Sequence, residues 1–129
     1  ALRVCPAGSE LAATVLAEVR AALDTPGSVA VICADAAVPV LTATLTGAGL
    51  AFASLAAVDA ERPTVEPRLS LVPAGLAKGL EFDHVVLVEP ADIVAAESTG
   101  LARLYVALTR AVSRLVVVHH GELPAELLG

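Results

Sequence analysis

The feature that most limits the fold of this chain is its alternation of short β-branched runs with segments of helical periodicity. The run Val29–Cys33 is wholly apolar, which is typical of a strand buried on both faces. Further strands are expected at Leu2–Cys5, near Ala51–Leu55, and at Arg68–Val72, Val85–Val88 and Leu115–His119. Helices are expected over 9–23, from an Asp35 cap through Leu41 and Leu45, over 99–112 and as a turn at 123–128. This order predicts an α/β fold in which helices cover both faces of a mainly parallel sheet.

Length and charge narrow the classes of function. The 129 residues suit one domain, spanning 1–129, and the segment 59–68, rich in proline and charge, is expected to be a surface connection within it. No apolar run approaches the roughly 18 residues of a membrane span, and no signal-peptide pattern is visible, so we expect a cytoplasmic protein without a membrane partner. The net charge of −6 argues against strong autonomous binding to a polyanion.

The two cysteines and three histidines do not indicate a metal site. Cys5 and Cys33 have no second ligand at zinc-binding spacing, so two buried free thiols are expected. His84, His119 and His120 are expected at strand ends, at the rim of the sheet, and we assign them no role. Asp83 and Asp92 stand where a turn or a helix cap favours a short carboxylate.

One segment whose residues could bind a ligand is Ala77-Lys78-Gly79-Leu80-Glu81-Phe82-Asp83, which precedes an apolar strand. Lys78 is the only lysine in the chain. A cation, a carboxylate, and a glycine that lets the backbone approach a ligand would lie together at the rim of the sheet. The alternative is an ordinary turn whose charges are solvated.

A second such segment runs from Leu101 to Arg114. On a helical wheel its apolar residues share one stripe, while Arg103, Arg110 and Arg114 share the opposite side. Guanidinium groups suit bidentate contacts with phosphate, although an amphipathic helix with a solvated basic face would show the same pattern.

Read together, the two segments resemble motifs V and VI of the UvrD/Rep branch of superfamily I helicases. The resemblance rests on Lys-Gly-Leu-Glu-Phe at 78–82 and on Tyr-Val-Ala-Leu-Thr-Arg-Ala at 105–111, in the family's order. The strand and helix over 29–50 resemble motif IV more weakly. The resemblance implies a RecA-like, P-loop NTPase-like three-layer fold. It also implies the C-terminal half of an ATP-dependent DNA helicase or translocase, with a superfamily I parent chain that is a hydrolase.

The resemblance also implies roles for single residues. Arg110 matches the arginine finger that reaches the ATP γ-phosphate, and Glu81 matches the glutamate that contacts the nucleotide ribose. Gly79 gives the loop its close approach to the nucleotide, and Lys78 matches a lysine near the nucleic-acid backbone. The chain has no Gly-x-x-x-x-Gly-Lys-Ser/Thr loop. ATP with Mg²⁺ is therefore expected to bind mainly to an N-terminal RecA-like lobe of the parent chain, and the isolated fragment is expected to be inactive.

Three departures from the family pattern leave open which macromolecule the motor acts on. Pro73 and Gly75 replace a threonine and a histidine that contact single-stranded DNA in relatives, and the segment 33–36 has no arginine. The amino-acid sequence of residues 76–83 is similar to that of HelD-type helicase-like ATPases. The partner is therefore DNA or RNA polymerase, and the alternative function is an RNA polymerase-binding module of a HelD-like factor that does not unwind DNA. A small doubly wound ligand-binding domain would need a glycine-rich first turn, for which Pro6-Ala7-Gly8-Ser9 is a poor substitute.

Overall fold

The computed structural model describes residues 2–6, 11–55, 68–77, 79–95 and 106–119. The strands are β1 (Leu2–Pro6), β2 (Val29–Cys33), β3 (Ala53–Ser54), β4 (Leu69–Pro73), β5 (Phe82–Val88) and β6 (Ala111–His119). The α-helices are α1 (Leu11–Leu23), α2 (Val38–Gly47) and α3 (Pro90–Ala95), and η1 (Asp35–Ala37) and η2 (Ala74–Leu76) are turns of 3-10 helix. Residues 106–108 are also helical.

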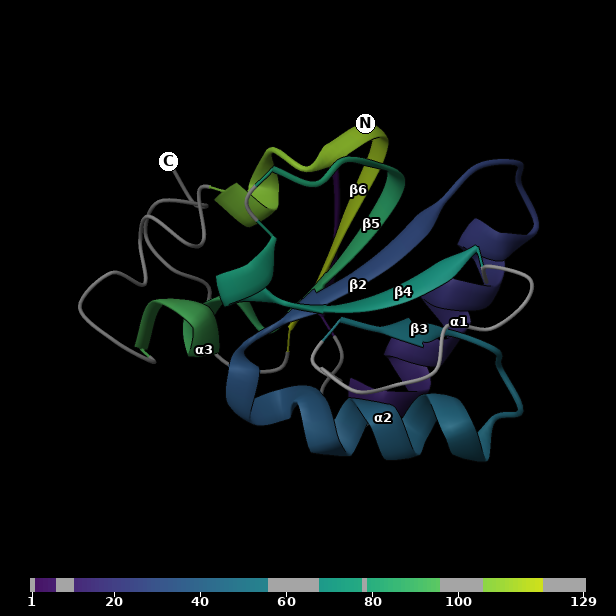
Figure 1. Cartoon of the computed structure of the whole chain (residues 1–129), viewed down its shortest axis with the longest axis horizontal. Coiled ribbons are helices and arrows are strands. Elements are labelled where there is room, and N and C mark those ends of the chain that lie inside the picture. Colours follow the sequence, from purple (N-terminus) through teal and green to yellow (C-terminus); the bar gives the residue numbers. More distant parts are fainter. Residues whose placement is uncertain (1, 7–10, 56–67, 78, 96–105, 120–129) are drawn as a thin grey trace.

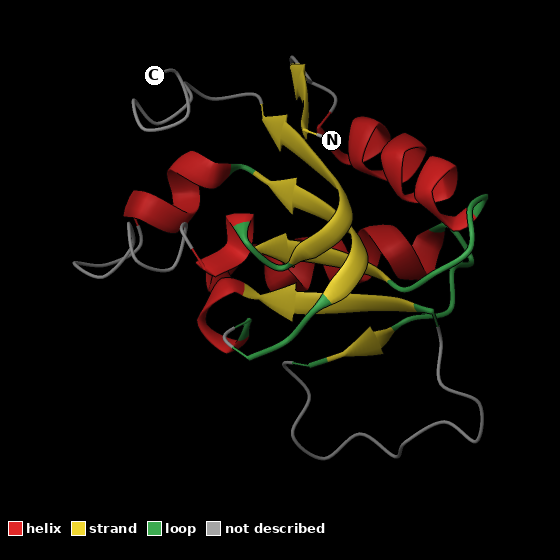
Figure 2. Cartoon of the chain, turned by 90° about the horizontal axis from the view of Figure 1, so that it is seen from above, coloured by secondary structure: helices red, strands yellow, loops and turns green. Residues whose placement is uncertain are grey.

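The strands form one sheet in the order β1-β6-β5-β2-β4-β3, and every neighbouring pair is parallel. The strand arrows in Figure 2 accordingly run in the same direction. All strands therefore begin at one end of the sheet, which we call the amino edge, and finish at the other, the carboxyl edge. The expected α/β fold with a mainly parallel sheet is confirmed.

Helical segments cover both faces of this sheet. α1 and α2 lie below it in Figure 1, whereas η2 and the helical residues 106–108 lie above it. The first face packs through a cluster that includes Val15, Val19, Leu41, Leu45 and Val86. The second face packs through a separate cluster that includes Ile32, Val72, Leu87, Ile93 and Ala107. Two cores on opposite faces give the three-layer arrangement.

The apolar run that predicted β2 has a direct structural cause. β2 lies between β4 and β5, and all five of its residues are buried. A side chain that points to either face of a central strand meets a packed layer, so alternation with polar residues would leave polar groups without water. Val31 and Cys33 accordingly join one core, and Ala30 and Ile32 join the other.

Two expected elements differ from the structure near the C-terminal motif. The helix expected to continue to residue 112 has already ended at Thr109, and β6 begins at Ala111 rather than at Leu115. The predicted helix was about one turn too long because Val112 fits the apolar stripe of a helix as well as it fits a strand. Arg114 therefore lies on β6 and not on a helical face shared with Arg110, and that prediction was wrong.

Smaller differences concern boundaries. β5 begins at Phe82, three residues before its predicted start, and β3 is only two residues long. Asp35 does not cap α2 through its side chain but lies in η1, where its Oδ1 accepts a hydrogen bond from the Gly75 N–H over 3.4 Å. The predicted surface connection up to residue 67, the start of the third predicted helix and the turn at 123–128 lie outside the described residues. None of the described helices is long and apolar enough to cross a membrane.

Candidate functional site at the amino edge of the sheet

The connection between β4 and β5 carries the first motif from one edge of the sheet to the other. β4 ends at the carboxyl edge with Pro73, and residues 74–81 return across the second face to the amino edge, where Phe82 begins β5. Ala74 and Ala77 pack into the core of that face. Their small side chains let this connection lie directly on the sheet, so the residues that follow emerge at the amino edge.

Gly79 and Glu81 lie on the exposed part of this connection. Gly79 has φ of +84°, a left-handed conformation that favours glycine, and among the described residues beyond its chain neighbours no atom lies within 4 Å of the position a Cβ would take. The conformation, rather than a close neighbour within this domain, therefore accounts for the glycine. The Glu81 side chain is exposed. Lys78 lies outside the described residues.

Arg110 is fixed by three hydrogen bonds that its guanidinium donates within the domain. Nε donates to the Val106 carbonyl over 3.0 Å, and Nη1 donates to the Leu80 carbonyl over 3.1 Å. Nη2 donates to the Thr109 hydroxyl oxygen over 3.1 Å. Each terminal nitrogen carries a second hydrogen, and neither has an acceptor among the described residues. Two N–H groups on the two terminal nitrogens are what a bidentate contact with phosphate oxygens requires.

The Arg110 backbone and side chain tie the two motifs together. The Phe82 N–H donates to the Arg110 carbonyl over 3.0 Å, while Arg110 Nη1 donates to the Leu80 carbonyl. Both bonds flank Glu81, so its backbone is held beside Arg110. The structure thus brings Gly79, Glu81 and Arg110 together at the amino edge of the sheet.

A second polar cluster at the amino edge was not predicted from the sequence. Asp83 Oδ2 accepts hydrogen bonds from the Ser28 N–H over 2.8 Å and from the Ser28 hydroxyl over 3.2 Å. The space beside Gly27, whose φ is +115°, is filled by the Asp83 carboxylate, only 2.6 Å from where a Cβ would be. Asp83 therefore closes the turn between α1 and β2, which agrees with its predicted turn role.

His84 lies near the start of β5 at the amino edge, as predicted, but it is buried within this cluster, which the sequence did not predict. The residue is 8% exposed, because β5 starts three residues earlier than predicted and the α1–β2 turn lies against the ring. Nε2 lies 2.9 Å from Thr25 Oγ1 and 3.1 Å from the Pro26 carbonyl. Thr25 donates its hydroxyl hydrogen to Ala22, so both neighbours of Nε2 are acceptors and Nε2 carries the proton. Nδ1 is buried without a partner among the described residues, so His84 has the bonds of a structural residue.

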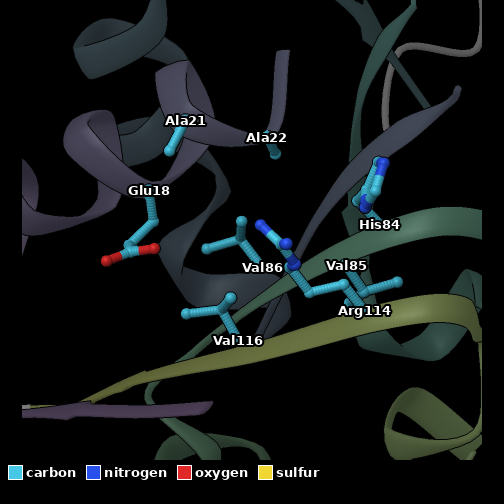
Figure 3. Close-up of a pocket in the computed structure, with 8 residues that line it drawn as sticks. All are labelled: Glu18, Ala21, Ala22, His84, Val85, Val86, Arg114 and Val116. Carbon is cyan, nitrogen blue, oxygen red and sulfur yellow. The ribbon is translucent and has the colours of Figure 1, made fainter. Parts of the chain in front are cut away.

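A pocket of about 290 Å³ lies on the other face of the sheet, between α1 and strands β5 and β6. Glu18 from α1 and Arg114 from β6 extend into the space between the helix and the strands, above Val86 and Val116 (Figure 3). Among the described residues of the predicted site, neither Gly79, Glu81 nor Arg110 lines it. Because Ala77, Leu80 and Ala107, which flank the predicted site, pack on the opposite face, we do not assign this pocket to that site.

The carboxyl edge has a different character. A shallow pocket of about 340 Å³ is lined by alanines and Asp92, between η1 and α3. Glu89 follows β5 in a left-handed conformation with φ of +48° and is buried, and its carbonyl accepts the Asp92 N–H at the start of α3. His119 ends β6 at this edge, half-buried, and His120 lies outside the described residues.

Cys33 at the end of β2 is a buried free thiol, as predicted. Burial, followed by the nearby Asp35 charge, raises the pKa of this thiol to about 12. Among the described residues no group of three or more histidine, cysteine or acidic side chains is arranged to hold a metal ion.

Similarity to solved structures shows which class of fold this is. The chain is similar to the C-terminal domain of a possible DNA helicase from Lactobacillus plantarum WCFS1, with 24% identity and a TM-score of 0.72, over 95% of this chain and 74% of that one. It is also similar to the Arterivirus nonstructural protein 10 helicase in complex with DNA, with 17% identity and a TM-score of 0.62, over 95% of this chain and 28% of that one. A third similar structure is the Sulfolobus solfataricus SWI2/SNF2 ATPase core in complex with double-stranded DNA. It has 15% identity and a TM-score of 0.61, over 94% of this chain and 27% of that one. These likenesses confirm the RecA-like fold, and the chain spans little more than a quarter of the last two proteins.

The sequence profile of the UvrD-like helicase C-terminal domain matches residues 76–118. The match begins within η2, runs through Arg110 and ends in β6, so it contains all four predicted site residues. No curated protein sequence matches the chain. The resemblance to UvrD-type motifs V and VI thus has support from an independent profile over the segment that forms the candidate site.

Proposed function

We propose that this domain is the C-terminal RecA-like half of an ATP-dependent DNA helicase or translocase. In this function Arg110 acts as an arginine finger on the γ-phosphate of ATP bound by an N-terminal RecA-like lobe of the parent chain. The observation that carries the proposal is the bonding of the Arg110 guanidinium. Three bonds to described residues fix its position, and within this part of the chain each terminal nitrogen keeps one hydrogen for an oxygen of the phosphate.

Glu81 and Gly79 complete the nucleotide-facing part of the proposed site. Two hydrogen bonds hold the backbone around Glu81 beside Arg110, while its carboxylate is exposed and able to accept hydrogen bonds from ribose hydroxyl groups. The open space beside Gly79 allows a ligand or the other lobe to approach the backbone closely. Lys78 lies next to Gly79 in sequence and is proposed to contact the nucleic-acid backbone.

The cofactor in this proposal is ATP with Mg²⁺, bound mainly by the other lobe. The residues of this domain fit one part of that ligand, because Arg110 offers cationic N–H donors to phosphate oxygens. Bound ATP supplies the phosphoryl group that is transferred to water. Arg110 stabilises the negative charge that develops on that group, and such fingers contribute on the order of 10³ to 10⁵ in rate. Because the domain supplies only this half, we expect the isolated domain not to hydrolyse ATP.

The test is ATP hydrolysis by the full-length protein with Arg110→Ala, in the presence and absence of single-stranded DNA. The expected result is a fall in kcat of at least about 100-fold with the fold intact. Arg20→Ala is the matched control, because Arg20 is an exposed arginine in the last turn of α1. Unchanged turnover in Arg110→Ala would mean that Arg110 is a structural arginine and would overturn the proposal.

A second candidate function is an RNA polymerase-binding module of a HelD-like factor that does not unwind DNA. The observation that favours it is the loss of polar and basic groups where relatives contact DNA: the Gly75 N–H is bonded to Asp35, and Pro73 is buried. A carboxylate at that position repels a phosphate backbone. Stimulation of turnover by single-stranded DNA supports the first function, whereas binding of RNA polymerase without DNA stimulation supports the second.

A further inference from the structure

The hydroxyl group of Thr109 lies between the end of the helical residues 106–108 and the Arg110 guanidinium. Its Oγ1 donates its only hydrogen to the Val106 carbonyl over 2.9 Å. The same oxygen lies 3.1 Å from Arg110 Nη2, so it must act there as the acceptor. The direction of both bonds is therefore defined, and the oxygen presents a lone pair to the guanidinium.

We propose that Thr109 is a positioning residue that fixes the plane of the Arg110 guanidinium for contact with phosphate. This inference rests on the proposed finger role of Arg110 and names the side chain through which the domain orients it. The bonds of Nε to Val106 and of Nη1 to Leu80 hold two of the three nitrogens of the planar group. The bond at Nη2, to an oxygen held by the Val106 carbonyl, holds the third nitrogen and completes the restriction of the plane.

The bonds at the three nitrogens have separate tasks. The Val106 carbonyl and the Thr109 hydroxyl hold Nε and Nη2 from the turn that precedes β6. The Leu80 carbonyl holds Nη1 from the connection between β4 and β5. Val106 and Leu80 contribute through backbone carbonyls that any residue would supply. Thr109 alone contributes a side-chain atom, so the sequence controls the orientation of the guanidinium at this position.

Thr109 can be changed without removing a buried contact, because its side chain is exposed. Thr109→Val keeps the shape and the β-branch but loses the oxygen, whereas Thr109→Ser keeps the oxygen and loses only a methyl group. A merely structural role at the helix end would appear as a lower unfolding temperature in Thr109→Val. A positioning role predicts a loss in the chemical step with the unfolding temperature of the full-length protein largely unchanged.

The experiment measures kcat and KM for ATP in the full-length protein with Thr109→Val, Thr109→Ser, Arg110→Ala and the double change Thr109→Val with Arg110→Ala. Thr109→Val is expected to lower kcat by about 10- to 100-fold with KM changed less than about threefold, because misplacement by about 1 Å costs up to about 100-fold. Thr109→Ser is expected to retain most of kcat. The double variant is expected to be no slower than Arg110→Ala, since Thr109 acts through Arg110.

A second readout separates orientation from ground-state binding. ADP with aluminium fluoride imitates the transferring phosphoryl group, and ADP alone does not. Thr109→Val is expected to weaken binding of the first by about tenfold and leave binding of the second unchanged. If Arg110→Ala is slow but Thr109→Val is as fast as the native protein, the positioning role is overturned and the proposed function stands. If Arg110→Ala is fast, the proposed function fails and the positioning role fails with it.

Discussion

The two edges of the sheet differ in the charges that they carry. Among the arginines whose side chains the structure describes, all lie toward the amino edge: Arg20, Arg68, Arg110 and Arg114. At the carboxyl edge the described charged side chains are acidic: Asp35, Glu89 and Asp92. The amino edge also carries the acidic residues Asp24, Glu81 and Asp83, so it holds charges of both signs, whereas the described acidic side chains of the carboxyl edge repel phosphate.

The edges also differ in how their turns are held. At the amino edge, side chains reach across the sequence: Asp83 bonds to Ser28, His84 to Thr25 and Arg110 to Leu80. At the carboxyl edge, Asp35 Oδ1 accepts a hydrogen bond from the Gly75 N–H over 3.4 Å, which is longer than these three contacts. The contacts at the amino edge hold the turns around the candidate site, and such preorganisation of charged groups favours catalysis. Three measurements of stability test this comparison.

The largest effect is expected from Gly27→Ala at the amino edge. The new Cβ would lie 2.6 Å from Asp83 Oδ2, in a backbone conformation with φ of +115° that side chains rarely adopt. Overpacking and backbone strain together predict a loss of about 3 kcal/mol in the free energy of unfolding, measured by urea denaturation. Gly47→Ala is the matched control, because nothing lies within 4 Å of its Cβ position at the end of α2, and it is expected to be neutral or slightly stabilising. Equal effects of the two changes would contradict the tight packing assigned to the amino edge.

An intermediate effect is expected at the carboxyl edge at alkaline pH. The Cys33 thiol ionises near its ordinary pKa of 9.0 in the unfolded chain, but burial and the Asp35 charge raise its pKa in the folded state to about 12. Above pH 9 the unfolded state thus holds fewer protons than the folded state, and this group lowers stability as pH rises from 9 toward 12. At pH 10 the loss is about 1.4 kcal/mol relative to pH 8.

The measurement compares urea unfolding at pH 8 and pH 10 for Cys33→Ala and for the protein with Cys33, both carrying Cys5→Ala. Subtracting the two pH effects removes the contribution of lysine, tyrosine and the terminus. A difference near zero would show that the Cys33 thiol is more accessible to solvent than its full burial indicates.

The smallest effect is expected from Arg68→Ala. Its guanidinium donates to the Leu23 and Gly27 carbonyls over 3.0 Å each and to the Thr25 carbonyl, at the end of α1. Because this side chain is exposed, the expected loss is only about 1 kcal/mol in the free energy of unfolding. Arg20→Ala, also exposed, is expected to change stability by less than about 0.5 kcal/mol. If thermal unfolding cannot distinguish the two, the amino edge owes little of its rigidity to this arginine.

The sequence allowed the sheet, the order of its elements and the edge that carries the motifs to be predicted. The strand Val29–Cys33 could be predicted because successive residues of a strand point to opposite faces, and both faces of a central parallel strand are covered, so every position is apolar. The boundary near Thr109 could not be predicted, since Val112 satisfies a helical stripe and a strand alike, and only pairing with β5 decides between them. Periodicity therefore located the elements better than their ends.

The polar contacts were less predictable than the elements. The burial of His84 depends on the α1–β2 turn, whose Thr25 and Pro26 lie nearly sixty residues earlier in the sequence. Asp35 was expected to cap a helix, but its carboxylate instead meets Gly75 from another connection. Local preferences decide a cap, whereas long-range geometry decides such contacts, and a single sequence contains no direct record of that geometry.

The connection between β4 and β5 has a mechanical consequence. Residues 74–81 run the full height of the sheet without a long helix, and their ends are attached at opposite edges: Gly75 to Asp35, and Leu80 to Arg110. A segment this short that spans the sheet has little conformational freedom, and its alanines pack directly against the strands. A displacement at the edge where β4 ends would therefore be transmitted through this connection to the Leu80 carbonyl, which holds the guanidinium at the opposite edge.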